Sequence, residues 1–198
     1  KGKYKDMKIK EMAELMVGQV MAKVEAKMEE DIIGKTRVLV PKAIKNGEIN
    51  HADLSEINIK TELDENKLTK EGDIVIKLSQ PYDAAYITKE DEGILVSSFY
   101  LLLRNIDLKI NPRYLVLMIN SEIYKEQAMS EASGVRIPML TKSKIQNIDL
   151  KLDLKFQDEI VKMSDKINKK ERIFNEIIKL EKLKLENILR GENNEKYN

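Results

Sequence analysis

The stretch FQDEIVKMSDKINKKERIFNEIIKLEKLKLENILRG, residues 156–191, has the pattern of one uninterrupted helix. Apolar residues recur every seven positions beside further apolar residues, and lysine and glutamate fill most other positions. The series and its neighbours are Ile160, Ile167, Phe174, Ile188, Met163, Ile177, Ile178 and Leu185. At about 1.5 Å per residue the helix is about 50 Å long, more than a domain of about 150 residues can cover. We therefore expect it to pair with a second helix.

The apolar stripe of this helix is irregular. Charged residues interrupt it at Lys170, Glu181 and Lys184. A second set of apolar residues widens it: Ile173, Leu180 and Leu183. A two-stranded zipper needs only a narrow stripe, so we expect the helix to contact more than one neighbour.

Composition limits the chemistry and the compartments open to the chain. Of its 198 residues 42% are hydrophobic, which suffices for one core and an appended helix. Cysteine is absent, so disulfides, cysteine nucleophiles and thiolate metal sites are excluded. No apolar run approaches about 18 residues, and the N-terminal residues lack the apolar core of a signal peptide. We expect a soluble, cytoplasmic protein without a membrane segment.

The charge balance names no polyanionic partner. Lys and Arg number 35 against 34 Asp and Glu, so any nucleic-acid surface must be a local basic face. The single histidine, His51, lies in a polar segment, and we interpret it as a solvated loop residue. One imidazole without neighbouring ligands makes neither a metal site nor a catalytic triad, so we expect no metal.

The middle of the chain is expected to be rich in strands. We predict strands at 36–40, 74–77, 94–96 and 99–104, with a turn at 45–48. The apolar segment 12–20 is expected to begin as a short helix or turn and to pass into a strand near 20–24.

Short helices are expected to follow the strands. Pro112 starts one, residues 121–132 form a second and residues 142–148 a brief third, with an extended piece at 135–140. The fold class is therefore α+β: a sheet-rich domain with short helices, followed by a long coiled-coil helix. We expect the domain to span residues 1–153, the helix 154–191 and a frayed tail 192–198.

Motifs for catalysis and cofactor binding are missing. The sequence contains no GxGxxG and no GxxxxGK[ST], so the usual glycine turns for nucleotide phosphates or a methyl donor are absent, and we expect no cofactor. Ser79-Gln80-Pro81-Tyr82 faintly resembles an amino-methyltransferase loop but lacks its first proline. Asp73 and Lys77, four apart on one expected strand, fit a turn residue and a surface charge better than a nuclease site. We expect no catalytic residue.

The ordered set of segments resembles a target-recognition module of the DNA-specificity (S) subunit of type I restriction-modification systems. The resemblance covers nearly the whole chain and is carried by these segments: Met12 to Met21; Val40-Pro41-Lys42 through Gly47-Glu48-Ile49; Leu68 to Ile76; Gly93 to Ser98; Asn111 to Leu115; Ser133 to Leu140; and a helix opening with Gln157 and Ile160. Each segment alone is common, whereas the ordered set ending in a long helix is more specific.

The resemblance implies a DNA-binding subunit that carries no active site. Such subunits bind double-stranded DNA and hold the methyltransferase (M) and restriction (R) subunits, which perform the catalysis. A usual member has two recognition domains and two long helices, whereas this chain has one of each. It resembles a half-length subunit or a fragment of a full one, and the family precedent implies an antiparallel homodimer through the long helices.

One departure from the family pattern concerns the start of the helix. Members commonly place Pro-Pro just before the glutamine that opens it, whereas this chain has Leu154-Lys155-Phe156-Gln157. The elbow between domain and helix is therefore expected to be less rigidly specified.

Loop residues are the candidates for DNA contact, because phosphate contacts supply affinity and base edges supply specificity. Gln80 suits adenine, Tyr82 and Tyr86 suit phosphates or thymine methyls, and Arg136 suits guanine or a phosphate. Both tyrosines have half-buried packing as an alternative role, and Arg136 has an ordinary surface role. The predicted DNA-binding set is Lys77, Gln80, Tyr82, Tyr86, Ser98, Arg136 and Lys142.

Two functions of different classes remain open. The first is a DNA reader that dimerises head to tail, recognises a palindromic bipartite sequence and recruits a methyltransferase. The second is a protein-interaction adaptor that uses its helix without binding DNA, which the near-neutral charge and the 5% aromatic content favour mildly.

Overall fold

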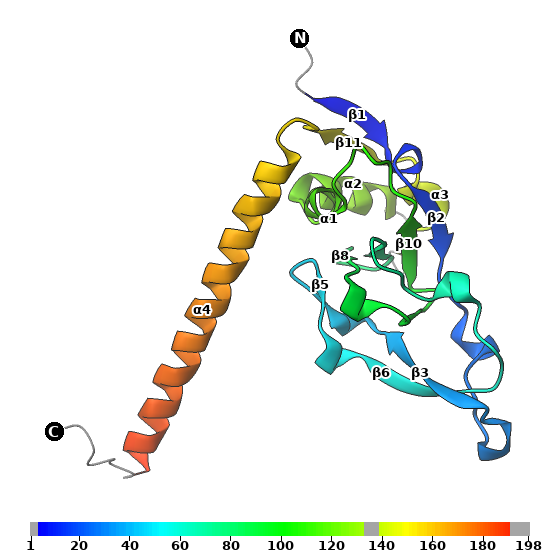
Figure 1. Cartoon of the computed structure of the whole chain (residues 1–198), viewed down its shortest axis with the longest axis horizontal. Coiled ribbons are helices and arrows are strands. Elements are labelled where there is room, and N and C mark those ends of the chain that lie inside the picture. Colours follow the sequence, from blue (N-terminus) through cyan, green and yellow to red (C-terminus); the bar gives the residue numbers. More distant parts are fainter. Residues whose placement is uncertain (1–3, 133–138, 191–198) are drawn as a thin grey trace. The chain divides into compact units, whose positions relative to one another are not determined.

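The computed structural model describes residues 4–132 and 139–190 (Figure 1). The chain divides into two compact units, Lys1–Asp158 and Glu159–Asn198. The first holds several small sheets and short helices, and the second consists of a long helix. The predicted α+β class is thereby confirmed. The functional limits predicted for the recognition domain stay a prediction, since compactness alone does not define a binding domain.

The central sheet of the first unit is antiparallel and has four strands. Their order is β2 (Glu14–Val17), β10 (Tyr100–Arg104), β7 (Ile74–Lys77) and β8 (Ala84–Tyr86). Within β10, Leu102 lies opposite Met16 of β2 on one side and Val75 of β7 on the other. Strand β10 therefore lies between β2, from the N-terminal part of the chain, and β7, from its middle.

Strands β7 and β10 are buried along nearly their whole length. Ile74, Val75 and Ile76 are fully buried, as are the apolar residues of β10. A strand with one solvated face alternates apolar and polar residues, so these continuous apolar runs indicate a sheet covered on both faces. One face lies in a core built from both halves of the unit: Leu39, Ala43, Ile44, Ile49, Val75, Ala85, Ile87, Ile94, Val96, Tyr100 and Leu102.

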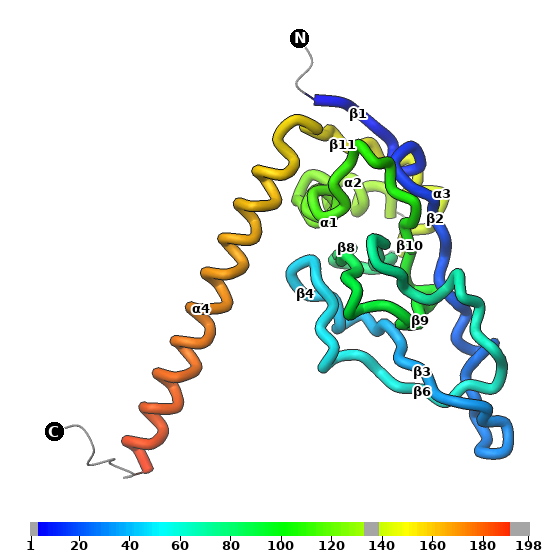
Figure 2. Tube along the Cα trace, in the orientation of Figure 1, coloured from blue at the N-terminus to red at the C-terminus, as the bar shows by residue number. Residues whose placement is uncertain are grey.

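A second sheet contains β6 (Ser55–Ile59), β3 (Gly34–Leu39) and β9 (Leu95–Val96), with β3 and β9 parallel. Figure 2 shows the chain running through this sheet beside the hairpin of β4 (Ile44–Lys45) and β5 (Glu48–Ile49). The hairpin turns at Asn46 and Gly47, both with positive φ. That conformation matches the twist of paired strands, and asparagine followed by glycine is its usual sequence.

Helices α1 (Pro112–Ile119), α2 (Glu122–Ala132) and α3 (Lys142–Ile145) follow the sheets. Asn120, which ends α1, covers the edge of the central sheet. Its Oδ1 accepts from the Ala84 N–H at 2.8 Å and its Nδ2 donates to the Ala84 carbonyl at 2.9 Å. The amide thus satisfies backbone groups of edge strand β8 that another strand would otherwise have to pair with.

The first and last strands of the unit pair with each other. Strand β1 (Lys5–Lys8) is antiparallel to β11 (Asp149–Leu152), with Lys5 opposite Leu152 and Lys8 opposite Asp149. The two strands lie side by side in Figure 1. Neither strand was predicted, because each has only four residues and its partner lies at the other end of the unit.

The first turn of helix α4 (Gln157–Leu189) is hydrogen-bonded to the loop before α1. Gln157 Oε1 accepts from the Asn111 N–H at 2.7 Å, and Gln157 Nε2 donates to the Lys109 carbonyl at 2.9 Å. Asn111 Nδ2 donates to Asp158 at 2.8 Å. Side-chain hydrogen bonds of Gln157 and Asp158 therefore fix the first residues of the helix against this loop.

Segment 12–24 differs from the sequence prediction. The strand lies at Glu14–Val17, and Met21–Lys23 forms a 3-10 turn instead of the predicted strand near 20–24. The apolar positions Met12, Leu15 and Met16 have helical spacing, but pairing with β10 imposes the extended form on residues 14–17. Tertiary pairing thus outweighs the local pattern.

His51 is exposed, as the sequence suggested, with 41% of its side chain accessible, but its imidazole also has partners that the sequence did not indicate. Its Nε2 lies 2.6 Å from Oδ1 of Asp91, whose side chain is 7% exposed, and its Nδ1 lies 3.4 Å from Arg37 Nη1. The imidazole therefore joins two segments that are 40 residues apart in the chain. Among the described residues, no three His, Asp or Glu side chains form a group that could hold a metal ion.

Asp73 is more than a turn residue, because it forms a buried ion pair with Arg104. Arg104 Nε and Nη2 donate to its two carboxylate oxygens at 2.9 and 2.6 Å, and Nη2 also donates to the Leu68 carbonyl. The hydrogen bond with Asp73 raises the pKa of the Arg104 guanidinium above its ordinary value. The pair ties the turn before β7 to the end of β10, and Lys77 takes no part in it.

No helix in the described ranges is both long enough and apolar enough to span a membrane.

Replacing Arg104 by Met is expected to lower the free energy of unfolding by about 3–5 kcal/mol, because it leaves a buried carboxylate without its cation. The matched control is Lys35→Met, which breaks the exposed pair between Lys35 and Glu56 and should cost less than about 1 kcal/mol. Urea unfolding of both variants measures the difference. Equal losses in the two variants would show that the Asp73 pair has no special role.

Candidate nucleic-acid interface

The tight turn between β7 and β8 presents two exposed residues at its tip. The Tyr82 N–H donates to the Ser79 carbonyl at 2.9 Å, and the Gln80–Pro81 peptide between them is cis. Gln80 and Pro81 are exposed, whereas Leu78 and Tyr82 on either side are buried. The Gln80 amide is therefore exposed at the tip of a turn whose flanking residues, Leu78 and Tyr82, are packed into the domain.

Backbone hydrogen bonds hold two other segments beside this turn. The Leu78 N–H donates to the Phe99 carbonyl at 2.9 Å, and the Leu78 carbonyl accepts from the Leu140 N–H at 2.8 Å. Ser79 also forms an antiparallel bridge with Met139. Three segments thus meet: 77–80, 97–99 and 139–142. We call this set of segments the loop edge.

The loop edge brings together four of the seven residues predicted to contact DNA. Gln80 and Lys142 are exposed, and Lys77 and Ser98 are half-buried. Lys142 is the first residue of α3, whose Thr141 cap accepts a hydrogen bond from the Lys144 N–H. An amide, a hydroxyl and two ammonium groups in one region are the types of side chain that address phosphates and base edges.

Tyr82 does not belong to this exposed set. Its side chain is 1% exposed, so in this fold it cannot reach a phosphate or a thymine methyl, and its proposed DNA contact is corrected to a packing role. Burial raises the pKa of its phenol. Its positive φ of 60° turns the chain back into the domain after the exposed tip.

Tyr86 and Arg136 are also not at the loop edge as described. Tyr86 is half-buried at the opposite end of the β7–β8 hairpin, where it pairs with Ile74 and its N–H donates to the Gly47 carbonyl at 3.0 Å. Arg136 lies outside the described residues. A DNA contact by either residue stays a prediction.

Two lysines near the β4–β5 hairpin have an acidic partner within the domain. Lys45 Nζ lies 2.5 Å from Asp53 Oδ2, and Lys42 Nζ lies 3.8 Å from Asp53 Oδ1. Lys45, mainly through its hydrogen bond, lowers the pKa of the Asp53 carboxyl. This compensation makes Lys42 and Lys45 weaker candidates for phosphate contact than the lysines of the loop edge.

Phe99 is a candidate that the sequence did not indicate. It is 49% exposed and stands next to Ser98 at the loop edge. The sequence placed it inside a strand, but β10 begins one residue later, at Tyr100, and this leaves Phe99 in the turn. The adjacent serines Ser97 and Ser98 were the available signal for a turn. An exposed aromatic ring beside a polar loop can make apolar contact with thymine methyls or stack on a base.

The position of this turn depends on Gly18. Its N–H donates to the Tyr100 carbonyl at 3.1 Å, and the next residue, Gln19, accepts from the Ser98 N–H at 2.8 Å. A Cβ on Gly18 would lie 2.1 Å from the Ser97 carbonyl oxygen. Only glycine permits the two backbones to approach this closely.

Three solved structures are similar to this chain in fold. The HsdS subunit from Thermoanaerobacter tengcongensis matches with a TM-score of 0.60 and 16% identity over 94% of this chain and 46% of its own. A chain from a study of assembly and conformational transition in a type I R-M system gives 0.56 and 14%, over 92% and 45%. The type I restriction-modification S subunit from M. genitalium gives 0.52 and 11%, over 89% and 43%.

These matches establish the fold and a difference in length. The chain spans somewhat less than half of each of these solved chains. Two of these structural neighbours are S subunits of type I systems and the other comes from a type I system, in agreement with the resemblance of the segments. No protein-family model matches the sequence, and no curated protein is similar to it.

Replacing Gly18 by Ala is expected to lower the free energy of unfolding by about 1–3 kcal/mol or more, because the new methyl group overlaps the Ser97 backbone. Gly34→Ala is the matched control, since its Cβ would meet only Ile59 side-chain atoms at 3.7 Å, and it should change stability by less than about 0.5 kcal/mol. Thermal or urea unfolding tests this. The proposed close approach would be refuted if Gly18→Ala were as stable as the control.

Proposed function

We propose that this chain is a half-length DNA-specificity subunit of a type I restriction-modification system. The observation that carries the proposal is the match of 89–94% of the chain, domain and long helix together, to less than half of each solved specificity subunit. A unit of this kind supplies one recognition domain. Two copies supply the pair of recognition domains that a full-length subunit contains.

The loop edge is the proposed DNA-reading surface. Exposed Gln80 can present its amide oxygen and nitrogen to the N6 and N7 positions of an adenine, and Lys142 can neutralise a phosphate. Lys77, Ser98 and Phe99 lie on adjoining segments that backbone hydrogen bonds hold in place. A rigidly held edge suits sequence reading, because a base contact requires a fixed position relative to the phosphates.

The long helix is the proposed site of self-association. Its apolar side chains are exposed along most of its length, with Met163 at 64%, Ile167 at 56%, Phe174 at 63% and Ile188 at 54%. Water-exposed apolar stripes of this length are stabilised by pairing with a second helix. In the proposed assembly two chains pair antiparallel.

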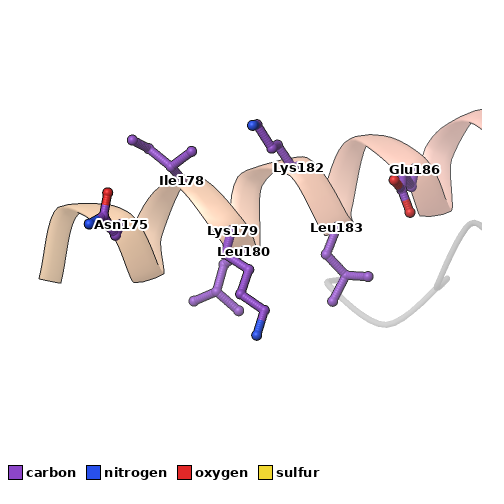
Figure 3. A pocket seen from close by; sticks show the side chains of 7 residues that line it. All are labelled: Asn175, Ile178, Lys179, Leu180, Lys182, Leu183 and Glu186. Atoms are coloured by element: carbon purple, nitrogen blue, oxygen red, sulfur yellow. The ribbon is translucent and has the colours of Figure 1, made fainter. Parts of the chain in front are cut away.

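A second apolar set on α4 remains for another partner. Figure 3 shows Leu180 and Leu183 pointing to the opposite side of the helix from Ile178. Together with Ile173 they are 48–59% exposed. We assign this side to the M subunit, with the R subunit joining the complete cytoplasmic assembly. The chain itself supplies specificity and no catalysis.

The proposed assembly determines the form of the DNA target. Two identical recognition domains related by a twofold axis read the same half-sequence on opposite strands, so the target is palindromic and interrupted by a nonspecific spacer. The expected result of sequencing methylated genomic DNA, with and without the gene and its methyltransferase partner, is one such motif. A methylated motif without twofold symmetry would contradict the homodimer.

Substitutions at the loop edge should separate affinity from specificity. Lys142→Gln is expected to weaken binding to all sequences and to reduce the slope of log K against log salt by about one per protomer. Gln80→Ala should instead lose about 1–3 kcal/mol of discrimination at one base position. Fluorescence anisotropy at several salt concentrations measures both effects.

Lys35→Gln is the control for these substitutions, because Lys35 is paired with Glu56 in the second sheet. Its DNA affinity should remain at the parent value. If the parent chain shows no salt-dependent DNA binding, alone or with the methyltransferase, the adaptor function replaces the specificity subunit.

A further inference from the structure

The charged residues that interrupt the apolar stripe of α4 are free to serve as contacts between chains. Lys170, Glu181 and Lys184 are exposed, and none has an ion-pair partner among the described residues. They occupy the same heptad positions as the apolar residues around them. A charge in such a position specifies which register of a coiled coil can form, because the facing residue of the other helix must be one that tolerates or neutralises that charge.

A parallel pair of α4 helices is disfavoured by these three charges. In parallel pairing each heptad position faces its own copy, so Lys170 meets Lys170, Glu181 meets Glu181 and Lys184 meets Lys184. Like charges this close destabilise the pair. The sequence of the helix therefore disfavours parallel pairing.

In one antiparallel register, opposite charges face each other instead of like charges. When Phe174 faces Ile177 of the second copy, Ile188 faces Met163 and Glu181 faces Lys170. By symmetry each of these layers occurs twice. Ile167 then faces Lys184, whose long aliphatic stem can cover the isoleucine while its ammonium group stays in water.

Antiparallel registers that are shifted by one heptad lose this complementarity. A shift in one direction sets Phe174 against Lys170 and Glu181 against Met163, with Ile160 against Lys184. A shift in the other direction sets Phe174 against Lys184, Glu181 against Ile177 and Ile188 against Lys170. Each shifted register has three layers that join an apolar residue to a charge, against one in the complementary register.

We propose that a second copy of this chain docks on α4 in the antiparallel register in which Lys170 pairs with Glu181. This inference rests on the proposed homodimer and specifies its contacts. The twofold axis passes between Asn175 and Glu176, next to the layers of Phe174 and Ile177. The two Lys170–Glu181 pairs flank the centre and select the register.

Charge exchange is the first test, with dimerisation measured by analytical ultracentrifugation of the full chain. Lys170→Glu and Glu181→Lys alone each place like charges in both layers, and each should raise the dimer Kd about tenfold or more. The double variant Lys170→Glu/Glu181→Lys restores opposite charges, and its Kd should return to within about threefold of the parent value. Glu176→Lys is the control for a charge change outside the heptad layers.

Disulfide trapping is the second test, which the absence of native cysteines makes clean. Met163→Cys/Ile188→Cys should form a covalent dimer under mild oxidation, because the two positions face each other across the chains. Each single cysteine should remain uncrosslinked, since antiparallel copies of either position lie about 37 Å apart along the helix at 1.5 Å per residue. Lys170→Cys/Ile188→Cys reports one of the shifted registers.

The outcomes separate the register from the function. Crosslinking of either single-cysteine variant, or of Lys170→Cys/Ile188→Cys without Met163→Cys/Ile188→Cys, overturns the register and leaves the specificity-subunit function intact. A double charge variant no better than the single variants also overturns it. A chain that stays monomeric with its methyltransferase partner and shows no DNA binding overturns the proposed function itself.

Discussion

The two backbone hydrogen bonds of Leu78 are the interaction on which the candidate site depends. Its N–H reaches Phe99 and its carbonyl receives Leu140, so one buried residue connects three segments from distant parts of the sequence. Side chains on these segments thereby gain a common location. A backbone junction of this kind permits the outward residues to vary while the loops keep their places, which suits the DNA-reading role proposed for this surface.

The sequence predicted elements better where the determinants were local. The strand of β7, the asparagine-glycine turn of the β4–β5 hairpin, the proline that begins α1 and the long helix all follow from nearby residues. The β1–β11 pairing and the strand at Glu14–Val17 could not be predicted, because distant partners determine them. His51 and Asp73 show the same limit, since their partners Asp91 and Arg104 lie 40 and 31 residues away.

The same distinction between local and distant determinants applies to the residues of the candidate site. Gln80 and Lys142 were identified from loop position and residue type, and the fold places both on exposed surface. Tyr82 has the residue type of a DNA contact but the environment of a core residue, and no local pattern distinguishes the two. Phe99 was missed for the opposite reason, because its apolar character suggested a strand interior and only the exact start of β10 exposes it.

The pairing of β1 with β11 has a consequence for how such chains can change. Strands β1 and β11 are adjacent and antiparallel at the two ends of the domain. All sheets and loops between Lys8 and Asp149 therefore belong to one continuous segment whose two ends lie side by side. Exchange of that whole segment for another of the same kind would leave the start of the flanking helix in place only if the new segment also supplied the backbone groups of Lys109 and Asn111 that are hydrogen-bonded to Gln157. Under the proposed function, recombination within these strands would then supply a new recognition specificity in one step.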